Sequence, residues 1–208
     1  MANENLQQPL VRIDGNKCLT IQGKETPHTV LDFWQWSSSD LLGNTMRGVL
    51  AEYIVGTALG ILKDVRIEWA EYDLLTHDGI KLEIKCSAYL QSWSQKRLSK
   101  ISFGIEPKMP QNPPPEPTTE PLLRRQADVY VFCLLHHRDM LTVNPLDLDQ
   151  WTFYCLATKK LDAECRDQKT LSLSRLLSLG PLVATYGELA SQVRKLGIID
   201  QGQPTSSL

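Results

Sequence analysis

The chain has 208 residues, of which 42% are hydrophobic and 22% are charged, a composition typical of a soluble globular protein with one sizeable core. The net charge of −2 and the pI near 6.1 exclude a protein that attracts nucleic acid through its overall charge, so any such contact must rely on local basic patches. Five cysteines without a Cys-x-x-Cys pair predict a reducing, cytoplasmic compartment. No signal segment or bilayer-spanning apolar run is apparent.

The N-terminal third is expected to lead into one long helix. Residues 10–13 and 18–21 flank a turn signal at 14–17, which indicates a hairpin. Trp34 and Trp36 are interpreted as core residues, and Asp40 as a cap for a helix over 41–62. This helix is apolar on nearly all sides, so it should be buried. Its Glu52 then needs a partner, either Arg47 or a core hydroxyl, or a bound cation.

A short strand is predicted over 65–70, followed by a β-hairpin over 71–85. Apolar and polar residues alternate on both sides of Asp78-Gly79. A three-residue loop of residues 77–79, with the glycine in the left-handed conformation, places Leu74 opposite Leu82.

The same register makes Asp73 and Glu83 a cross-strand pair, with β-carbons about 4.5–5.5 Å apart. Two carboxylates so close repel each other by a few kcal/mol at an effective dielectric of about 20. A divalent cation between them would remove the conflict, and oxygen ligands favour Mg²⁺ or Mn²⁺ over zinc. Lys85 lies two residues further along the same face.

The stretch after Lys85 mixes aromatic and basic side chains. Arg47 on the long helix and Gln95, Lys96 and Arg97 in this stretch are therefore candidate nucleic-acid contacts. An ordinary amphipathic helix with a cationic outer face is an equally good interpretation.

The C-terminal half predicts two central strands, over 128–135 and 151–157, and two short helices, over 171–179 and 186–196. Thr185 and Glu188 have capping-box spacing before the second helix. Residues 106–121 form a Pro-rich loop that could receive an SH3-like partner, and residues 197–208 are expected to be a disordered tail.

The arrangement of Asp73 with Glu83-Ile84-Lys85, following a buried helix that carries Glu52, resembles the PD-(D/E)xK nuclease superfamily. Tyr72 stands where the proline of the family name would be. The resemblance implies an α/β fold with a restriction-endonuclease-like core, in which a mixed central β-sheet is flanked by helices. It also implies that Asp73, Glu83 and Glu52 bind the metal and that Lys85 orients the attacking water.

The sequence thus predicts a single nuclease-like domain over 1–208, a Mg²⁺-dependent endonuclease that hydrolyses phosphodiester bonds, with DNA as its substrate. The competing interpretation is a catalytically silent module of the same fold that binds DNA or another protein. A homodimer would suit symmetric cleavage of a duplex, but no stretch of the sequence identifies an interface.

Overall fold

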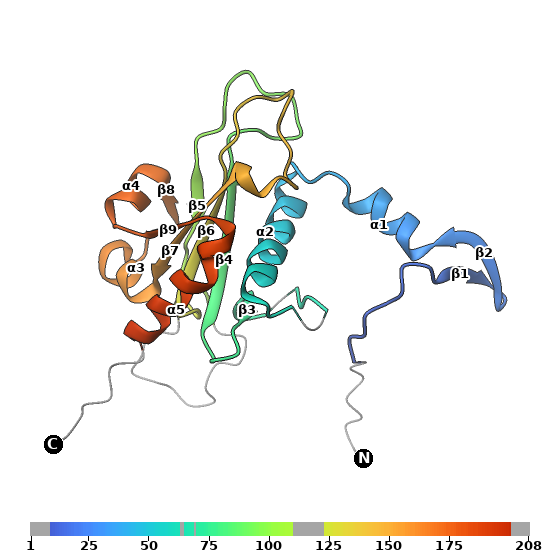
Figure 1. Cartoon of the computed structure of the whole chain (residues 1–208), viewed down its shortest axis with the longest axis horizontal. Coiled ribbons are helices and arrows are strands. Elements are labelled where there is room, and N and C mark those ends of the chain that lie inside the picture. Colours follow the sequence, from blue (N-terminus) through green and yellow to red (C-terminus); the bar gives the residue numbers. More distant parts are fainter. Residues whose placement is uncertain (1–8, 63–64, 69, 110–122, 201–208) are drawn as a thin grey trace, which may run out of the picture.

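The computed structural model describes residues 9–62, 65–68, 70–109 and 123–200. Its centre is a five-stranded sheet in the order β3-β4-β6-β7-β9 (Figure 1). The strands are β3 (Leu74–Leu75), β4 (Lys81–Ala88), β6 (Val129–Leu135), β7 (Trp151–Ala157) and β9 (Leu182–Ala184). β4 and β6 run parallel and the other neighbours are antiparallel. The predicted mixed sheet flanked by helices, as in a restriction-endonuclease-like core, is confirmed.

The sheet separates two apolar clusters. Alternate residues of β6 point to opposite faces, so Val131 joins one cluster and Phe132 the other. On the first face lie α2 (Asn44–Leu59) and α5 (Leu189–Asp200). The second face is covered by α3 (Thr158–Cys165), α4 (Leu173–Ser178) and the small sheet of β5 (Ser102–Gly104) and β8 (Thr170–Ser172). Burial on both faces explains why β6 is apolar throughout.

Helix α2 confirms the long helix, with tighter ends than the sequence indicated, but it is buried on one face only, and Tyr53 is exposed. Gly60 ends it in the left-handed conformation, with φ of 68°, which a glycine adopts without strain. The N-cap is Gly43, and the Asp40 carboxylate accepts a 2.9 Å hydrogen bond from the Gly43 N–H. Asp40 therefore closes the turn that precedes the helix.

Three predicted elements are wrong. Within 65–70, the described residues form no strand, and β4 is followed by a loop that reaches β5 without a helix. The N-terminal hairpin pairs β1 (Cys18–Ile21) with β2 (Lys24–Thr29) through Gln22-Gly23, because residues 14–17 form a turn that contacts a helix instead. That helix is α1 (Val30–Ser38). β1, β2 and α1 project away from the central sheet beside α2 (Figure 1).

The capping box of Thr185 and Glu188 is confirmed at the start of the short helix η2 (Tyr186–Glu188), which precedes α5. A second short helix, η1 (Leu148–Gln150), precedes β7. α5 continues to Asp200, while 201–208 and most of the Pro-rich loop, 110–122, lie outside the described residues. Within the part of the chain that the structure describes, no helix is long and apolar enough to cross a membrane.

Candidate active site

The hairpin of β3 and β4 has the predicted register. Leu74 pairs with Leu82, and the Thr76 N–H donates to the Ile80 carbonyl across a three-residue loop. Gly79 has φ of 84°, a left-handed conformation that favours glycine at the end of this loop. This loop brings Asp73 beside the segment that contains Glu83 and Lys85.

Asp73 lies just before the edge strand and is tied to β4 at two points. Its N–H donates to the Leu82 carbonyl at 2.9 Å, and its carboxylate accepts from the Ile84 N–H at 2.6 Å. Tyr72 packs against the second apolar cluster, with Lys81 over its ring, and not on the Leu74 face. Regular pairing begins only at Leu74, so the strand alternation does not extend back to residue 72.

Glu83 is buried, with only 6% of its surface exposed, and two ammonium groups satisfy it. Lys85 Nζ lies 2.5 Å from the Oε1 atom of Glu83, and Lys108 Nζ lies 3.3 Å from the same atom. Lys108 could not be identified from the sequence, because it belongs to the nonperiodic segment at the start of the Pro-rich loop. Glu83 also raises the pKa of Tyr130 on β6, although burial of that phenol is the larger cause.

Asp73 experiences the electrostatic repulsion that its place beside Glu83 predicts. Burial, followed by the negative charge of Glu83, raises the pKa of the Asp73 carboxyl to about 6. The hydrogen bond from Ile84 and the charge of Lys85 lower this pKa, but by less, and Glu52 raises it further. The three carboxylates therefore interact through Asp73.

Glu52 of α2 finds a partner that the sequence did not suggest. Arg66 Nε donates to Glu52 Oε2 at 2.5 Å, and a second guanidinium nitrogen donates to Oε1 at 2.8 Å. This fork is the geometry in which arginine binds carboxylates best. Glu52 and Arg66 both line a cavity of about 740 Å³ that Asp73 also lines.

The three carboxylates offer the oxygen ligands that Mg²⁺ prefers, but Glu52 and Glu83 already form ion pairs with cationic side chains. Among the described residues, no three acidic, histidine or cysteine side chains are grouped closely enough to hold one ion. Asp73 and Glu83 are hard oxygen donors whose repulsion a cation would relieve. Glu52 can become a third ligand only by leaving Arg66.

Of the four candidate nucleic-acid contacts, Arg47 and Gln95 form hydrogen bonds within the protein, whereas Lys96 and Arg97 are exposed. Arg47 is 3% exposed and donates to Gln91 at 2.9 Å, to Asn44 at 2.6 Å and to the Leu42 carbonyl. Arg47 thus ties the loop after β4 to the start of α2, while Gln95 accepts from the Gln91 N–H at 2.7 Å and braces the same loop from within. Lys96 and Arg97 are exposed and border a cavity of about 550 Å³. Their contact with nucleic acid stays a prediction.

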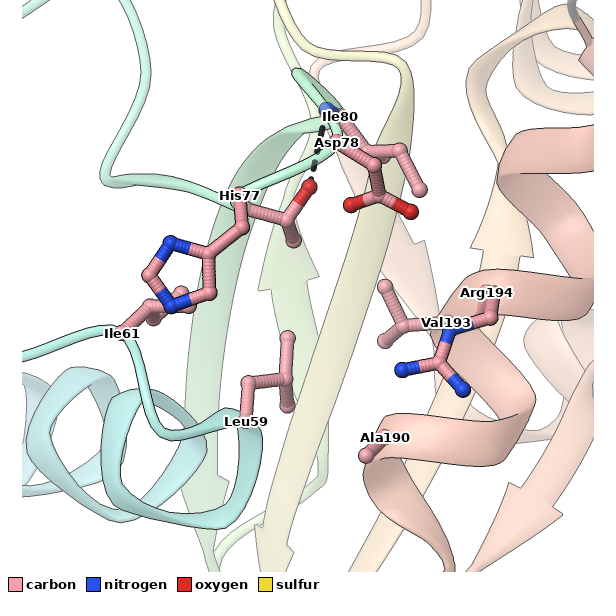
Figure 2. Close-up of a pocket in the computed structure, with 9 residues that line it drawn as sticks. Leu59, Ile61, His77, Asp78, Ile80, Ala190, Val193 and Arg194 are labelled. Atoms are coloured by element: carbon pink, nitrogen blue, oxygen red, sulfur yellow. Dashed lines mark hydrogen bonds between the residues drawn. The ribbon is translucent and has the colours of Figure 1, made fainter.

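Another cavity, of about 320 Å³, contains none of the predicted site residues. It lies between the end of α2, the β3–β4 turn and α5, where His77 and Arg194 approach it from opposite sides (Figure 2). Glu52 and Asp73 line the larger cavity instead, and Glu83 is buried on the interior strand β4.

In metal-free buffer, Asp73→Asn is expected to stabilise the protein at pH 7–8 by about 1–3 kcal/mol. The pKa of Asp73 is about 6 in the folded protein and 3.8 as the ordinary value, so folding favours the protonated carboxyl. Protonation of Asp73 contributes fully to the free energy of unfolding below about pH 4, and this contribution is lost as the pH rises through 6. The stabilising effect of the substitution should therefore appear between about pH 4 and 6 in urea unfolding curves.

Asp128→Asn is the matched control. The Asp128 carboxylate also accepts a hydrogen bond from a β4 amide, that of Lys81, at 2.8 Å. Its substitution removes a hydrogen-bonded carboxylate but leaves the Asp73 carboxylate beside Glu83 in place. A destabilised Asp73→Asn variant at pH 8 would contradict the electrostatic conflict described above.

Comparison with known families gives the class of the protein. Residues 4–175 match the family model described as bacteriophage T4 endonuclease IV. The chain belongs to this family. The match spans α2, the central hairpin, β6 and β7, and ends before β9 and α5, so the endonuclease family is assigned to the part of the chain that contains the candidate site. No curated protein matches the sequence.

Proposed function

We propose that the chain is a Mg²⁺- or Mn²⁺-dependent endonuclease of the PD-(D/E)xK type that hydrolyses phosphodiester bonds in DNA. The observation that carries the proposal is the Asp73 carboxylate, held at the sheet edge against the negative charge of Glu83 and beside Lys85. Membership of the endonuclease IV family and the restriction-endonuclease-like sheet support the same reaction.

In this proposal Asp73 and Glu83 hold the cation, and Glu52 joins them when Arg66 releases it. When bound, the cation lowers the pKa of a water molecule and neutralises charge on the scissile phosphate. Lys85 orients the attacking water and places positive charge beside the phosphate as negative charge develops. Lys108 adds a second ammonium on the same carboxylate.

The competing function is a catalytically silent module that binds DNA or a protein. The ion pairs of Glu52 with Arg66 and of Glu83 with Lys85 favour it, because they already neutralise two of the carboxylates. In that case Lys85 and Arg66 remain paired with the carboxylates, and a divalent cation does not bind there.

Addition of Mn²⁺ or Mg²⁺ is expected to raise the melting temperature of the wild-type protein. A ligand at a hundred times its Kd stabilises the folded state by about 2.7 kcal/mol, which corresponds to roughly 5–10 °C for a chain of this size. Differential scanning fluorimetry across a titration of each ion measures the effect. Asp73→Asn should abolish the shift, and Asp128→Asn should retain it.

Failure of both ions to shift the wild-type protein, together with no cleavage of any nucleic acid, would support the silent module. Supercoiled, linear duplex and single-stranded DNA, and RNA, form the substrate panel, so one experiment also identifies the substrate class. A shift that survives in Asp73→Asn would place the cation elsewhere.

A further inference from the structure

The N-terminal arm, residues 10–38, is a folded unit without a core of its own. Thr29 and Asp32 form a capping box at the start of α1, and the Leu31 N–H donates to the Gly15 carbonyl at 2.8 Å. Despite these local bonds, no residue from 9 to 39 is buried. The arm projects from the rest of the molecule (Figure 1).

The arm exposes a large apolar surface. Trp36 is 84% exposed and Phe33 is 53% exposed, on a helix that has no buried residue. Full burial of one aromatic side chain removes about 150–250 Å² from water, so the arm exposes on the order of 600 Å² of large apolar side chains. One partner of a standard protein interface buries about 800 Å². In β1 and α1 these side chains are Leu19, Ile21, Leu31, Phe33, Trp34 and Trp36, and Leu10, Val11 and Ile13 add further exposed apolar surface.

The charge of the arm favours a protein partner over nucleic acid. It has three basic residues, Arg12, Lys17 and Lys24, and three acidic residues. Binding to a phosphate backbone draws its affinity from an excess of positive charge, which the arm lacks. A neutral apolar surface can instead pack against an identical surface without repulsion.

The small size of the arm indicates that its partner is the arm of a second copy of this chain. Units below about 40 residues usually need a disulfide, a metal or association to be stable. The only cysteine of the arm, Cys18, is free, and the described residues of the arm contain no cluster of three or more metal-ligating side chains. Two arms together contain about sixty residues, a size at which domains fold alone.

We propose that the arms of two chains pack apolar face to apolar face about a two-fold axis and make the protein a dimer. Such an interface is self-complementary, since each arm presents the same residues to the other. The central sheets contribute no residue to this apolar face, although Arg12 of the arm lines the cavity of about 740 Å³ that Glu52 and Asp73 also line. The proposal does not depend on metal binding or on cleavage.

Sedimentation velocity of the full chain, from about 1 to about 100 µM, tests the proposal. The wild-type protein should sediment as a dimer of 23.5 kDa chains. The double substitution Phe33→Ser and Trp36→Ser should weaken association by about a hundredfold or more. Leu141→Ser is the matched control, because Leu141 is 94% exposed but lies outside the arm, and it should leave the dimer intact.

Circular dichroism and urea unfolding show whether the double variant retains the central fold, which does not contain either residue. A wild-type monomer at about 100 µM would overturn the proposal, as would a double variant that dimerises normally. The proposal would also be overturned if the wild-type protein is a monomer and the double variant binds a DNA oligonucleotide more weakly than the wild type. The arm would then be a nucleic-acid-binding surface.

Discussion

Lys85→Ala is expected to slow metal-dependent DNA cleavage by about 10²–10⁴-fold, the range that one proton-transfer or charge-stabilising group supplies. The Lys85 ammonium contacts Glu83 and is about one quarter exposed, so it can reach both a metal ligand and an incoming phosphate. Single-turnover cleavage of the best substrate, with both proteins purified identically, measures the loss. The carboxylates remain, so the Mn²⁺-induced thermal shift should persist.

Lys108→Ala provides the comparison for Lys85. Both ammonium groups contact the same oxygen of Glu83, but Lys108 is 67% exposed in its side chain and 3.3 Å away. A loss of less than about tenfold is expected, because a solvated charge contributes little. If removal of Lys108 slowed cleavage more than removal of Lys85, the roles assigned to the two lysines would have to be exchanged.

Arg47→Met is expected to destabilise the protein by about 3 kcal/mol, or roughly 6–12 °C in melting temperature. Arg47 is buried, and its loss leaves Gln91 and the Leu42 carbonyl without their donor. The loop after β4 then loses its connection to α2. Urea unfolding monitored by tryptophan fluorescence measures the change.

Arg97→Met separates structural from nucleic-acid roles. Arg97 is exposed, so its substitution should change stability by less than about 0.5 kcal/mol. If Arg97 contacts phosphate, DNA affinity should fall and its salt dependence should weaken. An Arg47→Met variant with wild-type stability and weak DNA binding would show that Arg47 is a phosphate ligand.

The central hairpin could be predicted because every part of its signal is local. Alternation sets the faces, Asp78-Gly79 sets the loop, and Leu74 opposite Leu82 follows. The strands β6 and β7 can also be predicted from the sequence, since long apolar runs are typical of buried strands. These elements contain Glu83 and Lys85 and position Asp73.

The partners of the carboxylates could not be predicted, because they come from segments without periodicity. Arg66 lies in a stretch whose apolar residues indicated a strand, yet its described residues form none and Arg66 bonds to Glu52. Lys108 approaches Glu83 from 25 residues further along the chain. Such contacts depend on how the loops pack, which no local pattern encodes.

The difference in length between β3 and β4 also has a consequence for motion. β4 is an interior strand of eight residues, whereas β3 has two residues and lies at the edge of the sheet. Short edge elements open at a small fraction of the free energy needed to unfold the whole protein. Asp73 is thus held by an element that can detach and return while Glu83 and Lys85 stay fixed. Local opening of β3 would break the two hydrogen bonds of Asp73 to β4 and so separate its carboxylate from Glu83 and Lys85.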